Sequence, residues 1–218
     1  MQGQTHRVGG VLAALAGYTI LESNGLLISN INPLLQLAII YPFAVYGSVL
    51  PDLDHHWDSC PSKDVVSFGI NKFLHIGKGL EKMGLKKFGG AIDAKHRSWQ
   101  THSLILLMGM IVALWFTVKA GAETANIVII KLMLSGLILG VLSHLILDAI
   151  TPQGIWLLIP SMIRRKKTTL HLVPRTKFFA TGNRWEDLIK ILLWVAIIAL
   201  IVRMLYLVSP YRISFNIK

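Results

Sequence analysis

Cysteine and charged residues are both scarce in this chain. A single cysteine, Cys60, among 218 residues excludes an internal disulfide framework, and nothing points to an oxidising compartment. Charged residues make up 15% of the chain, against about 25% in a soluble domain. Hydrophobic residues reach 53% and gather into long runs, so the sequence predicts an integral membrane protein rather than a large soluble core.

Acidic residues are also few, because 22 Lys and Arg stand against 11 Asp and Glu and give a net charge of +11. In a soluble protein this excess would suggest nucleic acid. In a membrane protein, topology and anionic headgroups explain it. We therefore expect membrane lipids as partners and no specific nucleic acid. The first apolar run is too short before Ala14-Leu15-Ala16 for a cleaved signal, and we keep it as a permanent helix.

The apolar runs predict an all-α integral membrane protein with about five transmembrane helices, since roughly 20 residues cross the hydrocarbon. The first span is the weakest, because Glu22 and Asn24 fall in its second half. The fourth carries Gly136 and Gly140, a pair of small residues suited to close helix contact. The spans of this single domain, 1–218, are predicted at about residues 8–28, 33–50, 102–118, 127–150 and 188–208.

Two long basic loops, residues 51–101 and 151–187, separate these spans, and the connections on the other side hold almost no Lys or Arg. The positive-inside rule places both loops and the N-terminus in the cytoplasm, and the C-terminus outside. Residues 65–88 mix apolar side chains with lysines, which predicts one or two interfacial amphipathic helices broken at glycines. Residues 155–159 are too short to cross and are expected at the interface.

Imidazoles and carboxylates stand at the ends of the predicted spans, all on the predicted cytoplasmic face. Neutral imidazole and carboxylate are ligands for zinc, manganese or iron. His144 and Asp148 are four residues apart, so both project from one face of a helix. The candidate metal ligands are His6, Asp52, Asp54, His55, His96, His102, His144 and Asp148.

This set is too large for a single tetrahedral ion, so we expect two divalent cations, about 3.5–4 Å apart, as in two-metal hydrolytic sites. Asp52 and Asp54 follow Pro51, and in an extended turn both carboxylates would reach one cluster. Arg97 is placed to pair with a phosphate, which a guanidinium binds better than an ammonium does.

Each candidate also has a simpler structural explanation. His6 alone would be an ordinary solvated terminal residue. Asp52 and Asp54 would cap a helix in the adjoining loop. His144 and Asp148 would hydrogen-bond each other as a structural pair. We assign three neighbouring residues to the solvated loop: His56, Asp58 and Cys60.

Several short motifs occur together along nearly the whole chain. They are Thr5-His6, Pro51-Asp52-Leu53-Asp54-His55, His96-Arg97, Thr101-His102-Ser103, His144 with Asp148, Thr151-Pro152-Gln153-Gly154, and Thr181-Gly182-Asn183 with Glu186. In combination they resemble the YdjM-like family, described as inner-membrane, metal-dependent hydrolases. The resemblance implies a helical membrane protein with such an activity, and it brings Glu186 toward the site as a supporting group or a base.

We therefore predict a membrane-bound metal-dependent hydrolase that acts on a phosphoester, lipid esters included, at the cytoplasmic membrane face. A carboxylate among Asp52, Asp54 and Glu186 would take the proton of the attacking water. The alternative is a metal-binding scaffold or regulator without turnover, whose basic loops dock a cytosolic partner. A transporter ranks last, because the ionisable groups lie at the ends of the spans rather than in their middle.

Overall fold

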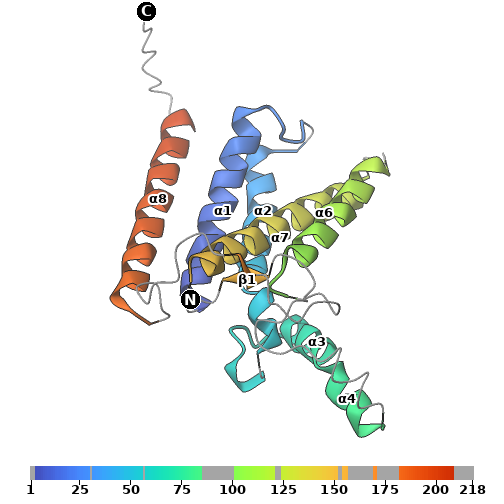
Figure 1. The fold of residues 1–218 in the computed structure, drawn as a ribbon. Coiled ribbons are helices and arrows are strands. Elements are labelled where there is room, and N and C mark those ends of the chain that lie inside the picture. Colours follow the sequence, from blue (N-terminus) through green and yellow to red (C-terminus); the bar gives the residue numbers. More distant parts are fainter. Residues whose placement is uncertain are drawn as a thin grey trace, which may run out of the picture.

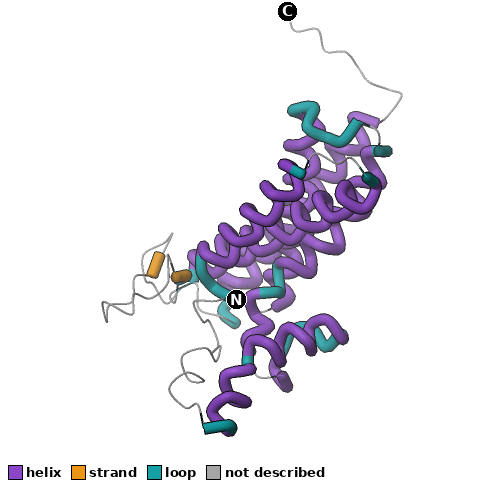
Figure 2. Tube along the Cα trace, turned by 90° about the vertical axis from the view of Figure 1, so that its right-hand side faces the viewer, coloured by secondary structure: helices purple, strands orange, loops and turns teal. Residues whose placement is uncertain are grey.

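The chain is an all-α membrane protein, seen here in a computed structural model. The structure describes residues 3–29, 31–55, 57–84, 101–120, 124–151, 154–156, 169–170 and 182–208. Its long helices are α1 (Gly3–Ser23), α2 (Pro33–Gly47), α6 (Leu104–Lys119), α7 (Ala125–Ile150) and α8 (Arg184–Val208). Figures 1 and 2 show α1, α2, α6 and α7 as a bundle, with α8 to one side against α1.

Within the described residues, three helical segments are long and apolar enough to cross a membrane: Pro33–Asp54, Ala125–Ile150 and Arg184–Tyr206. The predicted first span differs from α1 in its bounds, because α1 begins at Gly3 and ends at Ser23, which leaves Asn24 in a turn. The five-span topology and the cytoplasmic side of the loops stay predictions.

Helices α2 and α7 pack closely because α7 has glycines where they meet. A Cβ atom on Gly136 would lie 2.5 Å from the carbonyl oxygen of Ile40, and one on Gly140 would overlap the carbonyl oxygen of Ala44. Any side chain at either position would push the backbones apart. The predicted close contact at Gly136 and Gly140 is confirmed, and it sets the distance between α7, which carries two residues of the polar cluster described below, and α2, which leads into two more.

Two turns of 3₁₀ helix follow α2, and the first is η1 (Pro51–Asp54). The amide of Asp52 donates to the carbonyl of Val49 at 3.1 Å, and that of Leu53 to the carbonyl of Leu50 at 3.1 Å. The expected extended turn after Pro51 is therefore wrong. Proline is tolerated in the first turn of a helix, so Pro51 starts a tighter helical turn here. The second turn is η2 (Trp57–Ser59).

The polar segment after η2 folds into α3 (Val65–Leu74) and α4 (Ile76–Lys82). The two helices leave the bundle at the end where the N-terminus lies (Figures 1 and 2). Asp64 caps α3 by accepting the amide hydrogen of Ser67 at 2.8 Å, and hydrogen bonds from Ser62 and Ser67 hold the pKa of Asp64 below its usual range. The break between α3 and α4 falls at His75 rather than at a glycine, whereas α4 ends two residues before Gly84, whose φ is 90°.

The fold contains one small departure from a purely helical chain. Strands β1 (Ile155–Trp156) and β2 (Thr169–Leu170) form an antiparallel pair, with Ile155 opposite Leu170. Ile155 is buried against α7, in a cluster with Leu145 and Ala149. Most of the second loop lies outside the described residues, so the predicted interfacial segments there stay predictions.

Candidate metal centre

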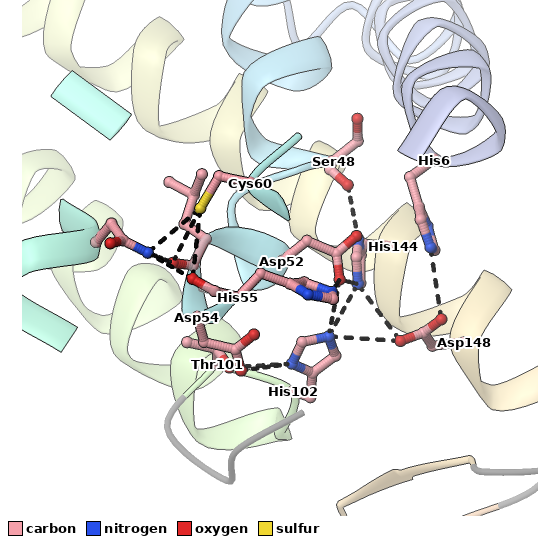
Figure 3. A network of polar contacts seen from close by, with 12 residues as sticks. His6, Ser48, Asp52, Asp54, His55, Cys60, Thr101, His102, His144 and Asp148 are labelled. Atoms are coloured by element: carbon pink, nitrogen blue, oxygen red, sulfur yellow. Dashed lines mark hydrogen bonds and ion pairs between the residues drawn. The ribbon is translucent and has the colours of Figure 1, made fainter. Parts of the chain in front are cut away.

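Six of the eight candidate ligands come together in one buried cluster at the end of the bundle where α3 leaves it (Figures 1 and 3). They arrive on four separate pieces of chain: α1, η1, the turn before α6, and the last turns of α7. Asp52 is the most exposed of them at 8%, and the others are exposed by at most 1%. The six are His6, Asp52, Asp54, His102, His144 and Asp148.

Four ligand atoms in this cluster face one another. His102 Nε2 lies 3.3 Å from His144 Nε2, 3.4 Å from Asp52 Oδ1 and 3.6 Å from Asp148 Oδ2. His144 Nε2 lies 3.8 Å from Asp52 Oδ1 and 3.4 Å from Asp148 Oδ2. Ligands about 2.0–2.2 Å from a tetrahedral ion stand about 3.3–3.6 Å from one another. The separations among His102, His144 and Asp52 therefore fit three ligands of one divalent cation, and Asp148 Oδ2 is a candidate fourth ligand close to both imidazoles.

Hydrogen bonds to Nδ1 of His102 and His144 orient both rings so that their Nε2 atoms face the other candidate ligand atoms. His144 Nδ1 lies 2.7 Å from the carbonyl oxygen of Ser48, which only accepts, so Nδ1 carries the proton. His102 Nδ1 lies 3.0 Å from the hydroxyl of Thr101, whose own hydrogen goes to Asp54 Oδ2 at 2.6 Å. In both neutral rings the lone pair is then on Nε2, the form that binds a metal.

A second, smaller group adjoins the first through Asp148. Oδ2 of Asp148 faces His102 and His144, whereas Oδ1 lies 3.5 Å from His6 Nε2. The His6 ring stacks on the His144 ring at 3.8 Å between centroids. His6, His144 and Asp148 offer ligand atoms within 4.8 Å of one another, but His144 has only one nitrogen free of Ser48. Two groups of three candidate ligands thus adjoin each other among the described residues, and they share His144.

A family comparison now bears on this cluster. The model of the YdjM inner membrane protein family matches residues 1–211. The chain belongs to this family. It is 31% identical over 164 residues to a Bacillus subtilis (strain 168) protein, YvsG, which is described as uncharacterized, and the match covers 75% of this chain and 76% of the relative. No solved structure matches it.

The remaining predicted site residues of this YdjM family member lie at the edge of the cluster or beyond the described chain. His55 Nε2 is 4.0 Å from Asp52 Oδ1, and its side chain is 31% exposed. His96 and Arg97 lie outside the described residues. Glu186 is buried at the start of α8, where Thr5 donates to Oε1 at 2.8 Å and the Gly182 amide donates to Oε2 at 2.7 Å. Glu186 thus fixes Thr5, the residue next to His6, through a hydrogen bond.

The structure rules out two of the three simpler explanations for the candidates. His6 is 1% exposed, so the alternative of a solvated terminal residue is wrong. Asp64, not Asp52 or Asp54, caps the helix in the adjoining loop. His144 and Asp148 do contact each other, at 3.4 Å, but the same two atoms also face His102.

Asn71 and Ser48 support the cluster, and the sequence did not single them out. Asn71 donates to the carbonyl oxygens of Leu53 at 2.6 Å and His55 at 2.8 Å, which fixes η1 and the carboxylates on it. A lone amide in an amphipathic stretch is the only signal that would have found it. Ser48 acts through its main-chain carbonyl, which any residue offers, so its side chain carries no signal for this role.

Cys60 lies beside Asn71 and also supports the cluster, and its assignment to the solvated loop is wrong. It is 7% exposed, and its thiol lies 3.5 Å from the carbonyl oxygen of His55 and 3.3 Å from Asn71 Nδ2. Burial raises the pKa of the Cys60 thiol, which keeps it protonated as a small, nearly apolar group.

Proposed function

We propose that this protein is a membrane-bound, metal-dependent hydrolase that acts on a phosphoester at the face of the membrane where the cluster lies. The observation that supports it is the convergence of His102, His144, Asp52 and Asp148 with both imidazoles oriented by hydrogen bonds. A divalent cation bound there supplies Lewis acidity and a bound water whose pKa is near neutral.

The chain itself supplies positioning and a proton acceptor. Thr101 and Asp54 hold His102, and the Ser48 carbonyl holds His144. Of the three carboxylates predicted as bases, Glu186 already accepts hydrogen bonds on both oxygens, and Asp54 accepts one from Thr101. Asp52 is the most exposed carboxylate of the cluster. We propose that Asp52 is the base that accepts the proton of the attacking water.

The substrate class follows from where the cluster lies. Its ligands stand at the ends of apolar helices, so a phosphoester held by an amphiphile in the same leaflet reaches them without leaving the membrane. Water attacks phosphorus, the phosphorus–oxygen bond to the alcohol breaks, and the alcohol oxygen takes up a proton. Arg97 remains our assignment for holding the phosphate.

The test is an assay of the full chain, purified in detergent, on a panel of soluble and lipid phosphoesters with added manganese or zinc. We expect His102→Ala and Asp148→Ala each to lower turnover at least 100-fold and to lower bound metal. Asp187→Ala is the matched control, because Asp187 is an exposed carboxylate on α8. Turnover that survives both cluster substitutions would remove this function.

One observation favours the non-catalytic alternative. His102, His144, Asp52 and Asp148 offer four candidate ligand atoms, the number that fills a structural zinc site, whereas a hydrolytic site keeps a position open for water. A cation with six positions, such as manganese, would leave two of them for water and substrate. Elemental analysis of the purified protein therefore separates the two functions. Tightly held zinc without turnover on the panel would support a metal-binding scaffold, and manganese or iron with turnover would support the hydrolase.

A further inference from the structure

An open groove of about 410 Å³ lies where α1, α2 and the segment after η2 meet. None of its lining residues is a candidate metal ligand. Arg7 and Ser62 line its polar end, and Pro42, Val45 and Val49 form an apolar wall along α2. The groove therefore has a cation at one end and hydrocarbon along its length.

The order of these residues along the membrane matches an amphiphile in one leaflet. Arg7 follows His6 directly, and Val49 lies three residues before Asp52, so the polar end is level with the metal centre. Val45 and Pro42 lie successively farther along α2, inside the span Pro33–Asp54. From Val49 to Pro42 the helix rises about 10 Å. That length accommodates a large part of an acyl chain.

Arg7 carries the positive charge that lines the groove. It is exposed, and its Nη2 donates to the carbonyl oxygen of Pro61 at 2.5 Å. A guanidinium has five N–H donors, so this bond holds the group in place and leaves four for a ligand. The Ser62 hydroxyl donates its hydrogen to Asp64 at 2.6 Å, so it does not donate to a phosphate in the groove.

We infer that this groove binds an anionic phospholipid, with the phosphate on Arg7 and an acyl chain along Pro42, Val45 and Val49. The forked guanidinium matches phosphate oxygens, and a net charge of +11 draws anionic lipid to the protein. The inference goes beyond the proposed hydrolysis, because binding in the groove needs neither metal nor turnover.

Native mass spectrometry of the full chain in detergent tests this, with phosphatidylglycerol and phosphatidylcholine of equal acyl chains as probes. We expect Arg7→Gln to lower phosphatidylglycerol binding about tenfold and to remove the preference over phosphatidylcholine. Arg7→Lys keeps the charge without the fork, so a smaller loss is expected. Val45→Phe fills the groove and lowers the binding of both lipids.

Matched controls lie on other helices. Lys119→Gln removes a cation from the end of α6, and Val195→Phe enlarges an exposed residue of α8; both are expected to bind lipid as the wild type does. Protein stripped of metal by a chelator should keep its phosphatidylglycerol, which separates this site from the metal centre.

Three results would overturn the inference. In the first, Arg7→Gln and Val45→Phe both bind phosphatidylglycerol like the wild type. In the second, chelation abolishes binding, which would place the lipid at the metal centre. In the third, inorganic phosphate displaces the lipid from the wild type while Val45→Phe has no effect, which would make the groove a site for free phosphate.

Discussion

Replacing Gly140 with alanine tests whether the close contact between α2 and α7 sets the geometry of the candidate metal centre. A Cβ atom on Gly140 would lie 2.7 Å from the Ser48 nitrogen and 2.8 Å from the Gly47 carbonyl carbon. Non-bonded carbon atoms settle at about 3.5 Å, and the Ala44 carbonyl oxygen is closer still, so α2 and α7 would have to separate by at least about 0.7 Å at this point. The distance from His144 Nδ1 to the Ser48 carbonyl oxygen would then grow from 2.7 Å to at least about 3.4 Å, beyond hydrogen-bond range.

We expect Gly140→Ala to lower metal affinity about 10- to 100-fold, the usual effect of losing a bond that orients a ligand. Overpacking should also lower the free energy of unfolding by about 1–3 kcal/mol. Elemental analysis after equilibration with graded metal concentrations measures the affinity, and thermal unfolding in detergent measures the stability.

Gly109→Ala is the matched control, because a Cβ atom there would meet nothing within 4 Å. This variant should keep wild-type metal affinity and gain up to about 1 kcal/mol, since alanine is favoured over glycine inside a helix. If Gly140→Ala bound metal as tightly as the wild type, the idea that the Ser48 carbonyl orients His144 would be refuted.

Three further predictions concern single residues. His144→Ala should remove the bound metal in elemental analysis, because the variant lacks an imidazole that belongs to both groups of candidate ligands; full metal content in the variant would contradict the ligand set. Asn71→Ala should cost about 1–3 kcal/mol in thermal unfolding and weaken metal binding, because buried carbonyl oxygens on η1 lose their donor; unchanged metal binding would count against this support. Asp64→Ala should cost about 1 kcal/mol at pH 7. The lowered pKa of Asp64 means that its stabilisation is present above pH about 4 and is lost on acidification, so the two proteins should converge in acid; a difference that persisted in acid would contradict this assignment.

The sequence was informative where local spacing or chain topology decides the outcome. His144 and Asp148 share a helix face because of the helical repeat, and the glycines at 136 and 140 mark the contact between α2 and α7 for the same reason. His6 and His102 were found because polar groups at the ends of apolar runs are rare and, when present, tend to gather.

Other features depend on tertiary structure that one sequence does not show. The turn at Asp52 and Asp54 is helical because η1 continues the bonding of α2, whereas proline alone suggested an extended chain. Cys60 is buried because α3 folds back and Asn71 reaches η1. The set of eight candidates also gave no means of telling which of them group together, since that depends on distances between atoms far apart in the chain.

The hydrogen bond between His144 and Ser48 joins residues 96 positions apart, and the centre also needs the first turns of α1. During synthesis on a ribosome, a nascent chain that ends before α7 lacks His144 and Asp148 and cannot form this arrangement. A metal ion bound by these residues would therefore enter only after insertion of the helix that ends at Ile150, and a truncated or mis-inserted protein would be recognised by its lower metal content.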